Sequence, residues 1–196
     1  MSGKALRLFV AAGIPSEARD ILGLAMDGSR AKIADARWVS AENLHLTLKF
    51  IGAYGEEALE GLSNELLETA ARCKPFKAAL GGCGAFPSPR KARVIWVGMC
   101  EGAESAGAVA RKLDARLERV GIERESRPFR GHITLARMKH PRDCAAALED
   151  LGKQLGGLQD RAFTVDEVVL YHSILGPQGP TYIALQRVAL GGNSHE

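Results

Sequence analysis

The chain of 196 residues has little cysteine, no long apolar run and no cluster of basic residues. No segment approaches the roughly 18 apolar residues of a membrane-spanning helix, and the run before Gly13 is too short for a secretory signal. The cysteines show no Cys-x-x-Cys pair, which argues against a zinc site and a disulfide framework. We therefore expect a cytoplasmic protein with reduced thiols. The four cysteines are Cys73, Cys83, Cys100 and Cys144.

The charge balance does not distinguish between classes of ligand or partner. A net charge of +3 permits an anionic ligand but does not by itself indicate a nucleic-acid partner. The glycine-rich stretch 81–84 is not followed by Lys-Ser or Lys-Thr, so it is not a nucleotide-binding loop. With 46% apolar and 25% charged residues, the chain is typical of a globular protein and fits one domain or two small lobes.

One tetrapeptide pattern occurs twice in a chain that has only five histidines. His-x-Thr-Leu stands at His45–Leu48, here called the first motif, and at His132–Leu135, the second motif, 87 residues further on. The composition predicts about 0.015 copies of this pattern by chance, so two copies indicate an internal duplication.

Hydrophobic periodicity and turn residues predict the same order in each half: strand, helix, motif strand, helix, strand. The interval from the first strand to the motif histidine is 37 residues in both halves, counted from Leu8 and from Ile95. The glycine-rich stretch 81–93 is expected to be loop for at least part of its length. The predicted strands are 6–12, 44–51, 76–80, 94–99, 131–138, 163–175 and 181–190, and the predicted helices are 17–32, 56–72, 103–120 and 141–155.

This order predicts two pseudo-symmetric lobes, approximately residues 1–85 and 86–196. The terminal hairpin, formed by the predicted strands 163–175 and 181–190, is free to cross between them. Because side chains alternate along a strand, His45 and Thr47 share one face and the neighbouring leucines the other. His132 and Thr134 share a face in the same way. If the two lobes meet across a cleft, both imidazoles and both hydroxyls converge there.

Two histidines and two threonines in one site favour acid–base chemistry on a phosphate group. Imidazoles with a pKa near 6.5 can serve as a general acid and a general base at neutral pH. Threonine hydroxyls can donate hydrogen bonds to phosphate oxygens. The sequence offers no set of metal ligands, so the pattern predicts metal-free acid–base cleavage of a phosphodiester.

With these motifs the chain resembles the 2H phosphoesterase superfamily, and within it the bacterial and archaeal RNA 2′,3′-cyclic phosphodiesterases, once named 2′-5′ RNA ligases. The similar segments follow the family's order and span nearly the whole chain. They are Arg7–Ala11, Asn43–Gly52, Phe86–Gly98, Arg127–Arg137 and Leu175–Tyr182. The resemblance implies an α+β fold of two antiparallel sheets flanked by helices, with the active-site groove between the lobes.

The resemblance also implies a reaction: water opens a 2′,3′-cyclic phosphate at an RNA 3′ end and leaves a 2′-phosphate. His45 would be the proton donor to the leaving 3′ oxygen and His132 the proton acceptor from water, although the symmetry makes this assignment easy to invert. Thr47 and Thr134 would hold the non-bridging phosphate oxygens. No cofactor and no metal are implied.

Three further residues carry an expectation. Arg137 matches a phosphate-contacting arginine of the family, but its odd offset from His132 puts it on the other strand face, so we expect the strand to end or twist before it. Phe9 is a candidate for stacking on a base. Gly131 stands where the family usually has proline, which stiffens the backbone, whereas glycine loosens it.

Other functions remain open at this point. The same site could act on cyclic phosphates of small nucleotides such as ADP-ribose, or run in reverse as a 2′-5′ RNA ligase. A protein that binds RNA ends without turnover is the alternative of a different class. In each case we expect RNA ends or small cyclic nucleotides as partners, no membrane, and a monomer.

Overall fold

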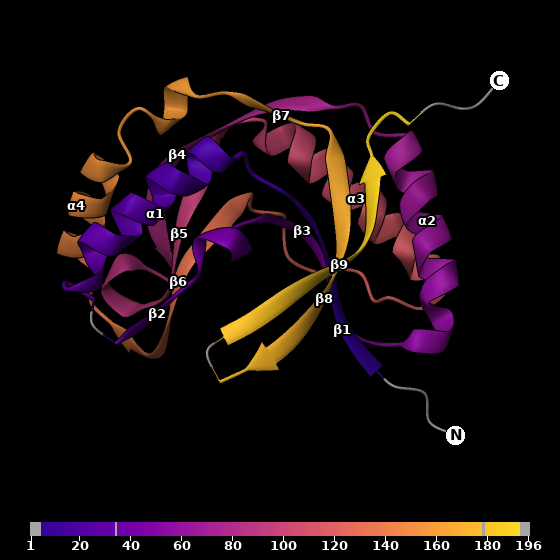
Figure 1. Cartoon of the computed structure of the whole chain (residues 1–196), viewed down its shortest axis with the longest axis horizontal. Helices are drawn as coiled ribbons and strands as arrows, with labels where there is room; N and C mark the ends of the chain where they lie inside the picture. The colour runs from indigo at the N-terminus through magenta and orange to yellow at the C-terminus, as the bar shows by residue number, and fades with distance from the viewer. Residues whose placement is uncertain (1–4, 34, 178, 193–196) are drawn as a thin grey trace.

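The computed structural model describes residues 5–33, 35–177 and 179–192, and contains two antiparallel β-sheets. Figure 1 shows the sheets as two neighbouring lobes, each with helices packed against it. Each lobe has its own cluster of buried apolar residues. The predicted α+β fold of two antiparallel sheets flanked by helices is therefore confirmed.

The first lobe is built on a four-stranded sheet with the order β3-β1-β8-β9. Helices α2 and α3 cover one face of it, where leucines at helical spacing (Leu62 and Leu66 of α2, Leu113 of α3) are fully buried. The elements of this lobe are β1 (Ala5–Ala12), β3 (Leu46–Gly55), α2 (Leu59–Ala71), α3 (Ala103–Leu117), β8 (Glu167–Gly176) and β9 (Gly179–Ala189).

The second lobe is built on a five-stranded sheet with the order β2-β6-β5-β4-β7. Helices α1 and α4 cover one face of this sheet, and Leu22 of α1 and Leu151 of α4 are fully buried there. The elements are α1 (Ser16–Arg30), β2 (Ala36–Trp38), β4 (Phe76–Phe86), β5 (Ala92–Glu101), β6 (His132–Arg142), α4 (Ala145–Gln154) and β7 (Phe163–Val165).

The lobes do not correspond to the consecutive segments 1–85 and 86–196 expected from the sequence. Helix α1 follows β1 along the chain yet packs on the five-stranded sheet, and α3 follows β5 yet packs on the four-stranded sheet. Strands β2 and β4 also belong to the second lobe, whereas the terminal hairpin β8–β9 lies beside β1. An apolar helix face shows that the helix is covered, but not which sheet covers it.

The glycine-rich stretch is irregular for part of its length, as expected, but its glycines belong to β4, which extends to Phe86 and so beyond the predicted strand end at residue 80. Gly82 has a φ of +66° at an irregularity in the β4–β5 ladder, where an L-residue would be strained. A Cβ at Gly84 would lie 2.5 Å from the ring of Trp96, so only glycine allows this ring to pack directly against the backbone of β4. Irregular structure is confined to the turn after Phe86.

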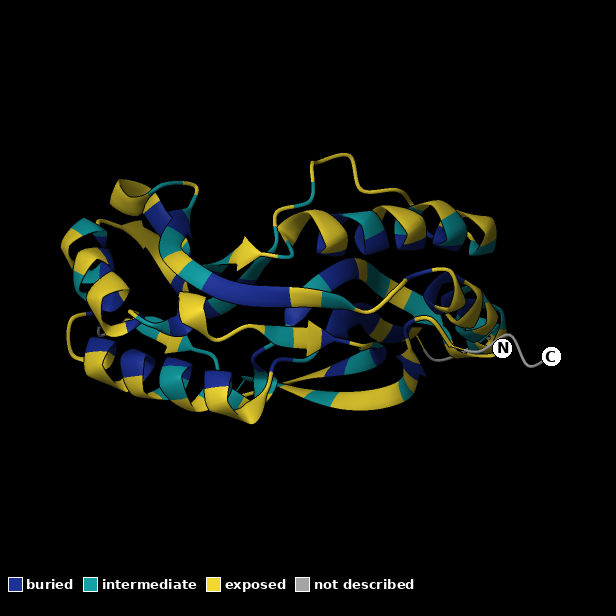
Figure 2. Ribbon diagram, turned by 90° about the horizontal axis from the view of Figure 1, so that it is seen from above, coloured by how far each residue is buried: buried dark blue, intermediate teal, exposed yellow. Residues whose placement is uncertain are grey.

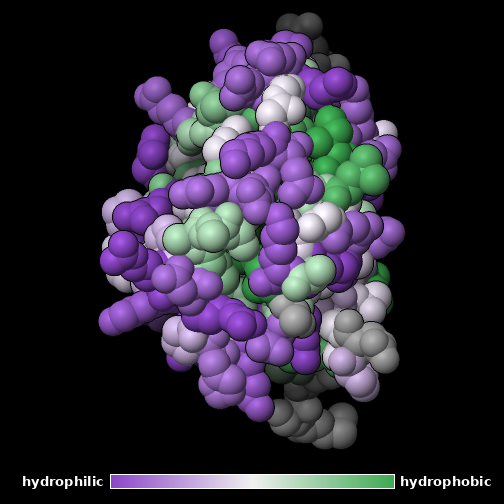
Figure 3. Space-filling view, turned by 90° about the vertical axis from the view of Figure 1, so that its left-hand side faces the viewer, coloured by the Kyte–Doolittle hydropathy of each residue, from purple (hydrophilic) through white to green (hydrophobic). Residues whose placement is uncertain are grey.

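The surface of the molecule is mostly polar. Figure 2 shows buried residues on the inner sides of the helices and exposed residues on their outer sides. On the side of the second lobe seen in Figure 3, hydrophilic side chains dominate and hydrophobic ones form small patches. Within the described ranges, no helix is long and apolar enough to cross a membrane.

Candidate active site

The alternation predicted for both motifs is observed. In the first motif His45 and Thr47 are partly exposed, and in the second motif His132 and Thr134 are partly exposed. The residues between and beside them point into the two cores, as the hydrophobic effect requires of a one-sided strand. These buried residues are Leu44, Leu46, Leu48, Ile133 and Leu135.

The two histidine rings are held in the same way. Nδ1 of His45 lies 2.6 Å from the main-chain oxygen of Asn43, and Nδ1 of His132 lies 2.7 Å from that of Arg130. A carbonyl oxygen can only accept, so Nδ1 carries the hydrogen in both rings. Each Nε2 is thereby left as the ring nitrogen that can accept or deliver a proton.

The carbonyl that holds His45 belongs to a residue that is itself anchored. The Nδ2 amide of Asn43 donates a hydrogen bond to the main-chain oxygen of Pro180, at a distance of 2.8 Å. Pro180 lies on β9, so the terminal hairpin fixes the approach to the first motif. The carbonyl that holds His132 belongs to Arg130, in the segment directly before β6.

Both histidines favour the neutral form in the free protein. Burial lowers the pKa of His45 below its ordinary value, the Asn43 carbonyl opposes this, and the charges of Arg137 and His132 lower the pKa further. Burial likewise lowers the pKa of His132, opposed by the Arg130 carbonyl and assisted by Arg137. His132 and Arg137 act on His45 from the other sheet, and β3 contacts β6, so the two motifs lie near each other where the sheets meet; this place is here called the groove.

A duplicated β-bulge shapes this groove. Val10 pairs with Lys49 and Ala11 with Thr47, which leaves Leu48 of β3 without a partner in β1. Leu135 of β6 is left unpaired against β5 in the same way. One extra residue inverts the alternation beyond it, so each strand has two consecutive buried residues after its threonine.

The bulge explains the place of Arg137. Of the two expected alternatives, an end of the strand or a twist, the first is wrong, because β6 continues to Arg142. Instead, the unpaired Leu135 shifts the alternation by one residue and brings Arg137 to the face of His132 and Thr134. Its charge accordingly acts on both histidines.

The equivalent position in the first lobe carries an aromatic residue. Phe50 follows Thr47 by three residues, as Arg137 follows Thr134, and its side chain is 61% exposed. Phe50 lies directly opposite Phe9 on β1, and the two ring centroids are 6.3 Å apart. The two bulges thus place a cation on one side of the groove and an aromatic ring on the other.

Phe9 is buried, with only 4% of its surface exposed, which disagrees with the expected stacking on a base. Its ring centroid lies 4.9 Å from that of His45, 5.2 Å from the stacked ring of Tyr171 and 4.9 Å from the edge-on ring of Tyr182. Phe9 therefore supports the His45 ring. The two tyrosines were not predicted at this site, although alternation along the terminal hairpin could have placed them on this face.

Aromatic rings also surround His132. The centroid of Phe86 lies 5.1 Å from that of His132, edge-on, and that of Trp96 lies 6.3 Å away. A Cβ at Gly131, the residue before this histidine, would lie 2.6 Å from the sulfur of Met99. Packing by these neighbours supports the His132 ring at the position where the sequence has glycine.

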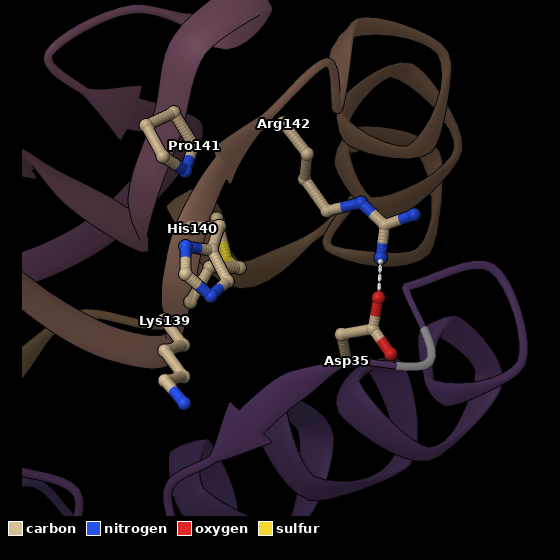
Figure 4. A pocket seen from close by; sticks show the side chains of 6 residues that line it. Asp35, Lys139, His140, Pro141 and Arg142 are labelled. Carbon is tan, nitrogen blue, oxygen red and sulfur yellow. Dashed lines mark hydrogen bonds and ion pairs between the residues drawn. The ribbon is translucent and has the colours of Figure 1, made fainter.

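Two other features lie outside this groove. In the part of the chain that the structure describes, no group of three or more His, Cys, Asp or Glu side chains could hold a metal ion. An open pocket lies at the far end of β6 from His132, where Asp35 and Arg142 form an ion pair of 2.8 Å (Figure 4). It is separate from the histidine pair.

Comparisons with known proteins identify the family. Residues 24–176 match the family model of the 2′-5′ RNA ligase superfamily. The chain is 34% identical over 181 residues to the RNA 2′,3′-cyclic phosphodiesterase of Methanothermobacter thermautotrophicus, covering 92% of this chain and 97% of that protein. It is 35% identical over 199 residues to the protein of the same name from Thermus thermophilus, covering 95% and 91%.

Solved structures give the same result. A crystal structure of a Thermus thermophilus protein superimposes with a TM-score of 0.77 at 29% identity, covering 95% of this chain and 99% of that one. Escherichia coli LigT in complex with 3′-AMP superimposes with a TM-score of 0.70 at 29% identity and the same coverage. The duplicated motifs, the paired sheets and these similarities together show that the chain belongs to the 2′-5′ RNA ligase superfamily.

Proposed function

We propose that this protein hydrolyses 2′,3′-cyclic phosphate ends of RNA by metal-independent acid–base catalysis and leaves a 2′-phosphate. The observation that carries the proposal is the matched pair of histidines, each with Nδ1 held by a main-chain carbonyl and Nε2 free to exchange a proton. Relatives named RNA 2′,3′-cyclic phosphodiesterase support the choice of substrate.

In the proposed reaction, Nε2 of neutral His132 accepts a proton from water as the water oxygen attacks phosphorus. The bond from phosphorus to the 3′ oxygen breaks, and Nε2 of protonated His45 donates its proton to that oxygen. One proton enters the pair and one leaves, so the histidines finish with exchanged protonation states. The same pair can form a 2′-5′ linkage if the 5′ hydroxyl of a second RNA attacks phosphorus in place of water and the same 3′ oxygen leaves, but the high concentration of water favours hydrolysis.

The phosphate would be bound by groups from both lobes. Thr47 and Thr134 lie two residues beyond the two histidines on the same strand faces and can donate hydrogen bonds to the non-bridging oxygens. Arg137 supplies the positive charge that stabilises the additional negative charge of the transition state. The terminal base would stack on Phe50, the exposed ring beside the site.

The assay that tests this function uses a defined oligonucleotide with a 2′,3′-cyclic phosphate, in the presence of EDTA. We expect complete conversion to the 2′-phosphate product, identified by its resistance to an enzyme that removes only 3′-phosphates. Exclusive formation of the 3′-phosphate would contradict the assigned leaving group. Loss of activity in EDTA, restored by a divalent cation, would contradict a metal-independent mechanism.

The lowered pKa values make a prediction about pH. The active form needs one protonated and one neutral histidine, so kcat/KM should be bell-shaped, with both limbs set by pKa values below the ordinary 6.5. Arg137→Gln removes a positive charge that lowers both pKa values, and should therefore raise both. NMR titration of the two imidazoles in the variant and in the unmodified protein measures this directly. Unchanged titration of both groove histidines would contradict the placement of Arg137.

A further inference from the structure

Two arginines lie directly opposite each other in the five-stranded sheet. Arg37 of β2 pairs with Arg137 of β6 in the antiparallel ladder. Directly opposed residues project to the same face of a sheet, and like charges in such a pair destabilise it. Both side chains are exposed. The repulsion between the two positive charges lowers the stability of the fold. An anion bound between or beside the arginines would offset this repulsion.

A third cation continues the row. Beyond the bulge, Ala136 and Met138 are buried and Arg137 is exposed on the face of His132. The β2–β6 ladder is regular through Met138, so alternation puts the next residue, the exposed Lys139, on the face of Arg137. Neighbours on one face of a strand are about 6.6 Å apart, which is similar to the separation of adjacent phosphates in a single-stranded nucleic acid. The row therefore leads from the histidine pair along β6.

These three cations have no acidic partner in residues 5–33, 35–177 and 179–192. The ion pairs of the described chain include none of Arg37, Arg137 and Lys139. Their neighbour Arg142 differs, since Asp35 neutralises it, and Figure 4 shows Lys139 apart from that pair. The positive charge of the row is thus available to a ligand.

From this row we infer that Arg37 and Lys139 bind backbone phosphates of the RNA on the 5′ side of the reacting end. The inference rests on the proposed function. A 2′,3′-cyclic phosphate is the 3′ terminus of its strand, so any further phosphate that the protein contacts must belong to the preceding nucleotides. The row makes an oligonucleotide a better substrate than a nucleoside 2′,3′-cyclic phosphate, which has no such phosphates.

The test compares a cyclic-ended tetranucleotide with a nucleoside 2′,3′-cyclic phosphate. In Arg37→Gln/Lys139→Gln, we expect kcat/KM for the tetranucleotide to fall at least tenfold and that for the nucleoside substrate to change less than twofold. Binding of a 2′-phosphate-ended tetranucleotide, measured by fluorescence anisotropy, should lose about 1.4 from the slope of log affinity against log salt, since each contact to a single strand contributes about 0.7.

The matched control is Arg72→Gln/Lys153→Gln, which removes the same charge from the helical layers of the two lobes. It should leave the substrate preference and the salt slope unchanged. An unchanged preference and slope in Arg37→Gln/Lys139→Gln, or an equal loss for both substrates, would overturn the inference. If the unmodified protein hydrolyses neither substrate, the proposed function fails, and the binding measurement still decides whether the two residues contact RNA phosphates.

Discussion

Replacing either groove histidine with alanine should lower kcat about 10³-fold, because general acid or base catalysis contributes roughly 10²–10⁴-fold. The double variant should be little worse than the poorer single variant, since the two groups act in one concerted step. The measurement is single-turnover hydrolysis of a cyclic-ended oligonucleotide by His45→Ala, His132→Ala and the double variant. Substantial activity in either single variant would contradict the two-histidine mechanism.

A modified substrate separates the roles of the two histidines. A sulfur atom in place of the bridging 3′ oxygen leaves as a thiolate and needs little protonation, so it makes a general acid dispensable. This substrate should restore much of the rate of His45→Ala and none of that of His132→Ala. The opposite pattern would invert the assignment. His140→Ala, at the far end of β6, is the control and should behave like the unmodified protein.

The second large effect is on stability and concerns Lys49, whose side chain the first bulge directs into the interior. The side chain is 5% exposed and its Nζ is bonded to the carboxylate of Asp114 on α3. Nζ also donates a hydrogen bond of 2.6 Å to the main-chain oxygen of Glu123, and Asp114 accepts one of 3.0 Å from the main-chain nitrogen of Glu125. Lys49 therefore joins the first motif strand to the segment that leads to His132.

Lys49→Met should lower the free energy of unfolding by about 3 kcal/mol, because it leaves the Asp114 carboxylate without its partner in a largely buried place. For a chain of this length the loss corresponds to roughly 6–12 °C in Tm. Thermal and urea unfolding measure both quantities. The double variant Lys49→Met/Asp114→Leu should recover a large part of the loss, since it leaves no unpaired charge.

The matched control for this prediction is Arg72→Met. Arg72 also forms an ion pair, with Glu68, but both side chains are more than half exposed. Exposed pairs contribute little, so the change should stay within about 0.5 kcal/mol. Equal effects of the two substitutions would contradict a special role for the buried pair.

Much of the site could be predicted from the sequence, because it depends on residues close together in the chain. Alternation alone placed His45 with Thr47 and their leucines in the core. The position of Arg137 could not be derived in this way. Whether a strand has a bulge depends on its pairing with another strand, and Leu135 looks like an ordinary core residue until β5 is set beside it.

The assignments that failed depended on contacts between distant segments. Phe9 was a reasonable candidate for base stacking until Tyr171 and Tyr182, more than 160 residues further along, were found against its ring. Periodicity identified α1 as amphipathic, but nothing in its own residues selects the five-stranded sheet over the four-stranded one. Local patterns thus predicted the elements, and tertiary packing decided their partners.

The placement of the helices also limits how the groove can move. The chain passes from one lobe to the other between β1 and α1, β2 and β3, α2 and β4, β5 and α3, α3 and β6, and β7 and β8. Six covalent connections spread along the lobes resist a hinge far better than one linker does. The separation of the two imidazoles is therefore set when the chain folds, so little orientation has to be gained when the cyclic phosphate binds.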